Sequence, residues 1–258
     1  MELLNTDGGT VISYDRYGEG PPLVLVHGAL SDSQSAWAMV KGLFGERFTV
    51  YAMNRRGRGE STATPEHRME DQFADVLALT ESIGEPAFLL GHSGGAWCAM
   101  GGAAMRPELV RKLVLYEPPA RTAAIVDAKD ELEGAARLKD WDLFVRTFLL
   151  SGPKTPSLEV NAIQGSPFWA PLVADAQASL WDFRAMHKYT LDIGRFAALT
   201  MPVLLLIGSD SPRDNYLTDP LAAVLPDHRI VELQGQAHIA QALAPQLFVD
   251  TVSEFLLG

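Results

Sequence analysis

Cysteine is nearly absent from this chain, which has one, Cys98, among 258 residues. A single thiol excludes an intrachain disulfide, and the apolar segment around Cys98 predicts a packing role rather than a nucleophile. The spaced pairs CxxC and HExxH are absent as well. The sequence therefore predicts no metal site.

Basic residues are also few, with 21 Lys and Arg against 32 Asp and Glu, and the formal net charge at pH 7 is -11. The densest basic stretch is residues 55–58, RRGR, so a nucleic-acid partner is not expected. No apolar run approaches the roughly 18 to 20 residues of a membrane span, and residues 1–5 lack a basic and then apolar signal region. We expect a cytoplasmic protein without a membrane partner, and the sequence leaves its oligomeric state open.

What the chain does have is an alternation of short apolar runs with longer segments of helical periodicity. Several short runs contain no polar residue, which is typical of strands buried on both faces. The alternation predicts an α/β protein with a mostly parallel sheet. The strand-like runs are Val11–Tyr14, Leu23–Val26, Phe48–Ala52, Ala87–Leu90, Leu113–Tyr116, Val203–Ile207 and Arg229–Leu233. The helical segments are Ser35–Phe44, Met69–Ile83, Ala96–Met105, Leu217–Val224 and Gln246–Leu257.

One region, residues 118–199, breaks this alternation because it contains no strand-like run. Its periodicity predicts helices over Val126–Arg137, Asp140–Leu150 and Pro171–Tyr189. We expect a core of residues 1–117 and 200–258 and a helical cap inserted over 118–199. Aromatic side chains in such an insertion pack into its own core or face a ligand, and we name three as substrate-binding candidates: Trp141, Trp169 and Trp181.

The pentapeptide GHSGG, residues 91–95, follows the apolar run that ends at Leu90 and precedes a helical segment. G-x-S-x-G in this context is the pattern of a sharp turn that strains one serine and lifts its hydroxyl above a sheet. The glycines would allow close packing at the turn. The sequence predicts Ser93 as a nucleophile, although the same five residues can also form an ordinary strand-to-helix turn.

A serine nucleophile needs a base, and six histidines are available. His238 follows the last strand-like run by a short loop, which places it at the same sheet edge as Ser93 and makes it the predicted base. His27 is expected to shape its turn and His92 to be directed away from the site. The remaining three are expected on the surface or in the insertion: His67, His187 and His228.

Over nearly its whole length the chain resembles an α/β-hydrolase. Four motifs occur in the order typical of that family, and they are residues 26–29 (VHGA), 54–61 (NRRGRGES), 91–95 (GHSGG) and 235–238 (GQAH). The resemblance implies an eight-stranded, mostly parallel sheet flanked by helices. Members usually carry Asp where this chain has Asn54, and that residue is generally thought to be structural.

The acid that would orient His238 has two candidates. In the commonest pattern of the family, the acid lies three residues past the glycine that ends a strand, which here is Gly208. That position holds a serine in this chain, and the nearby Asp210 is one residue away from it. Glu117 ends the neighbouring apolar strand, as in members such as haloalkane dehalogenases and resorcylate lactone hydrolases. Because a carboxylate there is costly unless paired, we favour Glu117 and keep Asp210 as the alternative.

The resemblance also implies an oxyanion hole made by two backbone N–H groups, those of Ala29 and Gly94. The expected activity is hydrolysis of a small, largely apolar ester or lactone through an acyl-enzyme, without a cofactor. Three alternatives remain open: a carbon–carbon bond hydrolase of a vinylogous diketone, a cofactor-free perhydrolase, and a receptor on the same fold that retains its ligand.

Overall fold

An eight-stranded sheet forms the centre of the computed structural model, which describes residues 1–6 and 8–258. The strand order is β1-β2-β4-β3-β5-β6-β7-β8, with β1 and β2 antiparallel to their neighbours and the others parallel. The α/β fold expected from the sequence is confirmed. The strands are β1 (Glu2–Asn5), β2 (Val11–Tyr17), β3 (Pro22–Val26), β4 (Thr49–Met53), β5 (Ala87–His92), β6 (Val110–Tyr116), β7 (Val203–Gly208) and β8 (His228–Leu233).

The register of the central strands brings their carboxyl ends together. Val26 of β3 pairs with Gly91 of β5, and His92 pairs with Tyr116 of β6. The residues that follow these strands in the chain therefore start from one edge of the sheet. Strand β1 was not predicted, because it is a mostly exposed edge strand without an apolar run.

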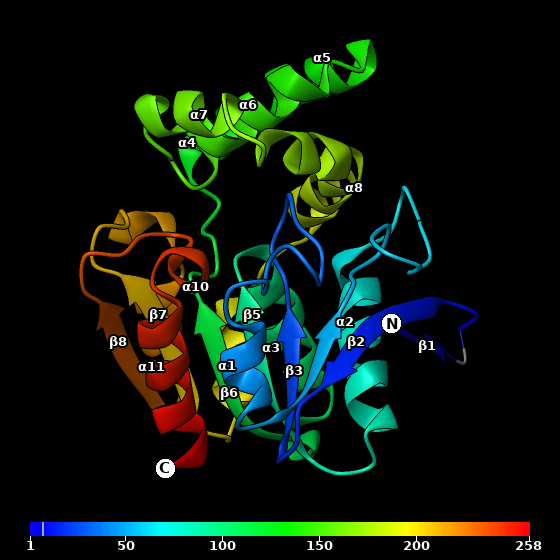
Figure 1. Ribbon diagram of the computed structural model, residues 1–258, viewed down its shortest axis with the longest axis vertical. Coiled ribbons are helices and arrows are strands. Elements are labelled where there is room, and N and C mark those ends of the chain that lie inside the picture. The colour runs from blue at the N-terminus through cyan, green and yellow to red at the C-terminus, as the bar shows by residue number, and fades with distance from the viewer. Residues whose placement is uncertain (7) are drawn as a thin grey trace.

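Helices cover both faces of the sheet (Figure 1). On one face α1 (Lys41–Gly45) and α11 (Pro245–Leu257) pack against the strands, and on the other α2 (Met69–Ser82), α3 (Gly94–Met105) and α9 (Thr218–Ala222) do so. The prediction of a helix over Ser35–Phe44 is wrong for its first half. There, residues 33–40 form turns, because the Asp32 carboxylate accepts the N–H groups of Gln34 and Ser35.

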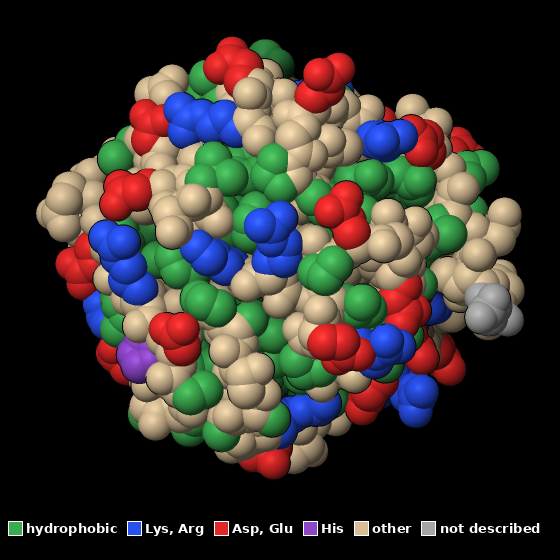
Figure 2. Space-filling view, turned by 90° about the horizontal axis from the view of Figure 1, so that it is seen from below, with side chains coloured by type: hydrophobic (Ala, Val, Ile, Leu, Met, Phe, Trp, Pro, Cys, Tyr) green, Lys and Arg blue, Asp and Glu red, His purple; other side chains and the backbone are tan. Residues whose placement is uncertain are grey.

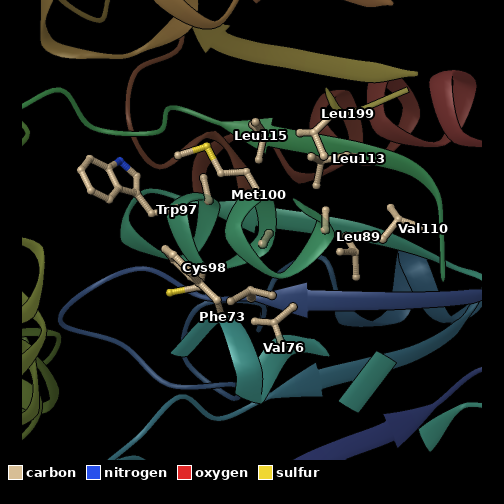
Figure 3. Packing of buried hydrophobic residues seen from close by; sticks show 14 of the residues in the cluster. Phe73, Val76, Leu89, Trp97, Cys98, Met100, Val110, Leu113, Leu115 and Leu199 are labelled. Carbon is tan, nitrogen blue, oxygen red and sulfur yellow. The ribbon is translucent and has the colours of Figure 1, made fainter. Parts of the chain in front are cut away.

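Figure 3 shows the packing on the α3 side of the sheet. Phe73 and Val76 of α2 meet the small residues of α3, and a Cβ at Gly101 would overlap the Phe73 ring. Cys98 is buried in this cluster, and burial raises the pKa of its thiol to about 11. The expected packing role of Cys98 is confirmed.

Above the carboxyl ends of the parallel strands lies a layer of helices (Figure 1). Its members are α4 (Ala123–Asp127), α5 (Lys129–Leu138), α6 (Trp141–Ser151), α7 (Ser157–Gln164) and α8 (Trp169–Lys188). These helices share a buried cluster that includes Leu132, Phe144, Leu180 and, from the core, Leu30. Five helices stand where the periodicity predicted three, because the first predicted helix is divided at Ala128 and α7 was missed.

The surface opposite this layer carries acidic and basic side chains interspersed with apolar ones (Figure 2). Three short 3-10 helices lie between helices and strands, and they are η1 (Pro107–Leu109), η2 (Ile193–Ala198) and η3 (Arg213–Asn215). A short α-helix, α10 (Ala240–Leu243), follows β8. Among the described residues, no helix is both long and apolar enough to cross a membrane.

Candidate active site

Ser93 stands at the turn between β5 and α3 with a φ of 54° and a ψ of -127°. Few residues other than glycine adopt a positive φ, and those that do are often held at functional sites. The turn is fixed by the Ser93 N–H, which donates to the Tyr116 carbonyl at 2.9 Å, and by the Ala96 N–H, which donates to the Ser93 carbonyl. A Cβ at Gly91 would lie 2.5 Å from the Cα of Ala96, so the glycine allows this close approach.

Glu117, which is fully buried, and His238, which is partly exposed, form a pair at the same edge. Nδ1 of His238 lies 2.6 Å from Oε2 of Glu117, and the other carboxylate oxygen accepts the Gly208 N–H at 2.8 Å. Burial alone would raise the pKa of Glu117, but the His238 ring and the hydrogen bonds to the carboxylate outweigh it and lower that pKa. The hydroxyl of Tyr216 lies 3.2 Å from the same Nδ1, and its ring stacks on the imidazole.

Asp210, the alternative acid, lies elsewhere. It is exposed, and its carboxylate accepts a hydrogen bond from Ser209 Oγ at 3.0 Å, with no bond to His238. The offset of one residue in the loop after β7 turns this side chain toward solvent. Of the two acids considered, the structure brings only Glu117 to the imidazole.

Ser93 and His238 both line one cavity of about 450 Å³ between the sheet edge and the helical layer. Its wall is mainly apolar. In the part of the chain that the structure describes, no hydrogen bond joins Ser93 Oγ to the His238 ring. Hydrogen bonds of this kind are often long before substrate binds and tighten in the complex.

Ala29 and Gly94 also line the cavity, beside Ser93. Gly94 is the first residue of α3, so its N–H has no partner within the helix, and the helix dipole favours negative charge there. Neither the Ala29 nor the Gly94 N–H donates to another described residue. Both amides are therefore free to bind an anionic oxygen.

A family model described as "Alpha/beta hydrolase family" matches residues 23–251, which is most of the chain. The chain belongs to the alpha/beta hydrolase family. The eight-stranded sheet is thus that of an alpha/beta hydrolase, and the chain is an enzyme of the hydrolase class.

Individual relatives of this alpha/beta hydrolase cover nearly the whole chain. The (E)-2-((N-methylformamido)methylene)succinate hydrolase of Acinetobacter baylyi is 27% identical over 95% of this chain and 94% of its own. The 2-(acetamidomethylene)succinate hydrolase of Mesorhizobium japonicum is 24% identical over 96% and 92%. The crystal structure of an alpha/beta hydrolase from Sphaerobacter thermophilus is 30% identical, with a TM-score of 0.84, and covers 97% of this chain and 100% of that one.

Trp141, Trp169 and Trp181 were the predicted substrate-binding residues, but none of the three lines the cavity of this alpha/beta hydrolase, so this prediction is corrected. Trp169 is buried in the helical layer and donates to Asp142 at 2.6 Å, and Trp141 packs edge-on against the Phe144 ring. Trp181 lies against Gly57. The aromatic residues that do line the cavity are Phe148, Phe168, Phe183 and Tyr216.

The histidines differ from expectation in two places. His67 was expected on the surface or in the insertion, but it is buried and contacts Asp182 and Gln72. His92 was expected to be directed away, yet it lines the cavity, and its ring centroid lies 4.7 Å from that of His238. His27 does hold its turn, through a 2.8 Å contact with the Gly28 carbonyl. These placements depend on the helices that cover the sheet edge, which the sequence order does not reveal.

The sequence also did not predict the buried charges near the site. Arg55 and Asp182, from the loop after β4 and from α8, form an ion pair that borders the cavity. Asn54 is buried and hydrogen-bonded to Ser33 N and Ser13 Oγ, as a structural residue would be.

Within residues 1–6 and 8–258, no three His, Cys, Asp or Glu side chains are grouped so that they could hold a metal ion. The chemical groups at the cavity are instead a hydroxyl, a paired imidazole and two free amides. Such a set can form and release an acyl ester without a metal.

Proposed function

We propose that the protein is a serine hydrolase that cleaves a small, largely apolar carboxylic ester or lactone through an acyl-enzyme. The observation that carries the proposal is that Ser93, at a strained turn, shares one apolar cavity with the ring of the Glu117–His238 pair. Free amides of Ala29 and Gly94 at the same place support it, because they could bind the oxyanion.

In this proposal the Nε2 atom of His238 takes the Ser93 proton as Oγ bonds to the acyl carbon. The negative charge on the carbonyl oxygen is held by the N–H groups of Ala29 and Gly94. His238 returns the proton to the departing oxygen, and the C–O bond of the ester breaks. Water then gives a proton to His238, attacks the acyl carbon and releases the acid, and the proton returns to Ser93. Glu117 stabilises the imidazolium in both steps.

We further propose that residues 118–199 act as a cap that shapes the acyl pocket. The support is that Phe148 and Phe183 of the helical layer face the cavity, which is apolar and lies between that layer and the sheet. Such a pocket suits an apolar acyl or alcohol group of modest size.

The first experiment is hydrolysis of p-nitrophenyl acetate by the wild type and by Ser93→Ala. We expect the variant to lose the activity and the label of a fluorophosphonate while keeping the wild-type circular dichroism spectrum. Ser157→Ala, an exposed serine of α7 outside the cavity, serves as the matched control. Near-wild-type hydrolysis by Ser93→Ala would remove the nucleophile from the proposal.

A second candidate function is hydrolysis of a small amide that bears carboxylates, because two relatives that cover nearly the whole chain are hydrolases of (N-methylformamido)methylene and acetamidomethylene succinates. Arg121 lines the cavity and donates to the backbone carbonyls of His187 and Tyr189, so its positive charge is not neutralised by a carboxylate among the described residues and would attract an anionic substrate. A substrate panel separates the candidates: aryl esters and lactones, N-acylaminomethylene succinates, a dienol diketone, and acetate with peroxide. Bound product without turnover would instead favour a receptor.

A further inference from the structure

The two peptide groups that flank Ala29 are each held by buried side chains. On one side, the Gly28 carbonyl accepts from Nδ1 of His27 at 2.8 Å and from Nη1 of Arg55 at 3.2 Å. Nε2 of His27 accepts the Arg55 N–H, which assigns the proton to Nδ1. Because the C=O and N–H of a trans peptide point in opposite directions, holding the Gly28 oxygen also fixes the direction of the Ala29 N–H.

On the other side of Ala29, the Leu30 N–H donates to Oγ of Ser179 at 2.7 Å. Leu30 has a φ of 54°, a conformation that is strained for leucine and persists only where the surroundings hold it. Ser179 belongs to α8, so this bond connects the loop after β3 directly to the helical layer. Arg58 donates to the same Oγ at 3.0 Å and restrains it further.

Helix α8 also reaches Arg55. The Asp182 carboxylate pairs with Nη2 of Arg55 and accepts from Nη1 of Arg58 at 2.6 Å, and these three side chains are almost fully buried. Burial would raise the pKa of Asp182, but the two guanidinium groups outweigh it and lower that pKa strongly. Asp182 therefore remains charged at neutral pH. Since Ser179 and Asp182 are three residues apart, they lie on one face of α8.

We propose that Arg55, Ser179 and Asp182 are positioning residues through which helix α8 aims the Ala29 N–H at the oxyanion. The inference rests on the proposed function, because it assigns the oxyanion to an acyl carbon attacked by Ser93. It goes further in coupling the cap to catalysis. Displacement of α8 removes the Ser179 partner of the Leu30 N–H and the Asp182 partner of Arg55, and leaves His27 as the remaining side chain of these that holds the Gly28 carbonyl. The Ala29 N–H is therefore fully restrained only while this helix is seated.

Ser179→Ala is the main test, because it removes one hydroxyl from this connection and leaves the ion pair in place. Loss of a whole oxyanion donor costs about 10²- to 10³-fold in kcat, so a donor that is no longer held should cost about 10- to 100-fold. We expect this loss in kcat when it is normalised to the amount of Ser93 that a fluorophosphonate labels. KM for p-nitrophenyl acetate should change less than about two-fold. Arg55→Lys keeps the positive charge but loses the planar guanidinium with its several N–H donors, and it should behave in the same way.

Arg184→Lys is the matched control. Arg184 lies on the same helix, but it pairs with Glu133 and has no bond to the Ala29 loop. We expect wild-type kcat from this variant. Phenylboronic acid gives an independent measurement, since its tetrahedral adduct with Ser93 places an anionic oxygen in the oxyanion hole. Its affinity should fall at least ten-fold in Ser179→Ala and stay unchanged in Arg184→Lys.

Equal kcat and equal boronate affinity in Ser179→Ala and Arg184→Lys would overturn the inference, even if Ser179→Ala melts at a lower temperature. A slower Ser179→Ala with full boronate affinity would overturn it too. If Arg55→Lys does not fold, Ser179→Ala decides alone. Ser93→Ala in the same assay distinguishes failure of this inference from failure of the proposed function. If Ser93→Ala keeps its activity, the proposed function is wrong, whatever the α8 variants do.

Discussion

Nδ1 of His238 lies 2.6 Å from Oε2 of a fully buried Glu117, and the backbone of Glu117 has a φ of 49°. A buried carboxylate at this distance stabilises an imidazolium far more than one in water would. Its pKa is lowered, so it carries its charge at neutral pH. This pair is the basis of the first prediction.

Glu117→Gln should lower kcat for p-nitrophenyl acetate by about 10³- to 10⁴-fold, because the amide keeps the shape and loses the charge that orients and stabilises the ring. Asp210→Asn is the control, since that exposed carboxylate contacts Ser209 and not the imidazole. Steady-state kinetics of both proteins decide between the two acids. The opposite ranking would move the acid role to Asp210.

The sequence was sufficient to predict the parallel strands and the edge where the functional groups meet, because buried strands have local apolar signatures and their carboxyl ends share an edge. It was also sufficient to favour Glu117, since a carboxylate ending an apolar strand needs a partner. It did not separate Trp169 from Phe183. Both lie on α8, and which of them faces the cavity depends on how that helix packs against the rest of the fold.

The tight packing between β3 and α3 gives a second prediction. A Cβ at Gly95 would overlap the carbonyl oxygens of Val26 and His27, which cannot move without distorting the strand. Gly95→Ala should therefore lower the free energy of unfolding by about 1–3 kcal/mol or more and reduce kcat by displacing Ser93.

Gly134→Ala is the control for that variant. Gly134 lies inside α5, and outside the backbone of its own helix the nearest described atom to an added Cβ would be Nη2 of Arg137 at 3.7 Å, so the change should raise stability by about 0.5–1 kcal/mol. Urea unfolding of the two variants measures both effects. A Gly95→Ala protein as stable and active as the wild type would show that the elbow does not need a glycine there.

The buried histidines give a third prediction, on stability against pH. Burial lowers the pKa of His27 and of His92 well below the usual value, helped by Arg55 and Arg58 for the first and by His238 for the second. In the unfolded chain both rings bind protons near pH 6.5. Their contribution to stability is therefore complete above about pH 6.5 and is lost as the pH falls toward the lowered values of the folded state.

Between pH 6.5 and 5, each ring should reduce the free energy of unfolding by up to about 1.4 kcal/mol per pH unit. Urea unfolding at pH 7.5, 6.5 and 5.5 measures the slope, which should be smaller in His92→Asn. The exposed His228 provides the control, and His228→Asn should keep the wild-type slope. Stability that does not change from pH 7.5 to 5.5 would contradict the neutral state of the buried rings.

The last prediction separates the wall of the cavity from the interior of the helical layer. Phe148 lines the cavity, so Phe148→Ala should enlarge it and raise the ratio of kcat/KM for p-nitrophenyl octanoate to that for the acetate by about ten-fold. Trp169 is buried in the layer and donates to Asp142, so Trp169→Phe should leave that ratio unchanged and lower stability by about 1–3 kcal/mol. Kinetics with the two esters and thermal melts of both variants measure these effects. A Trp169→Phe protein with altered chain-length preference and unaltered melting would restore Trp169 as a substrate-binding residue.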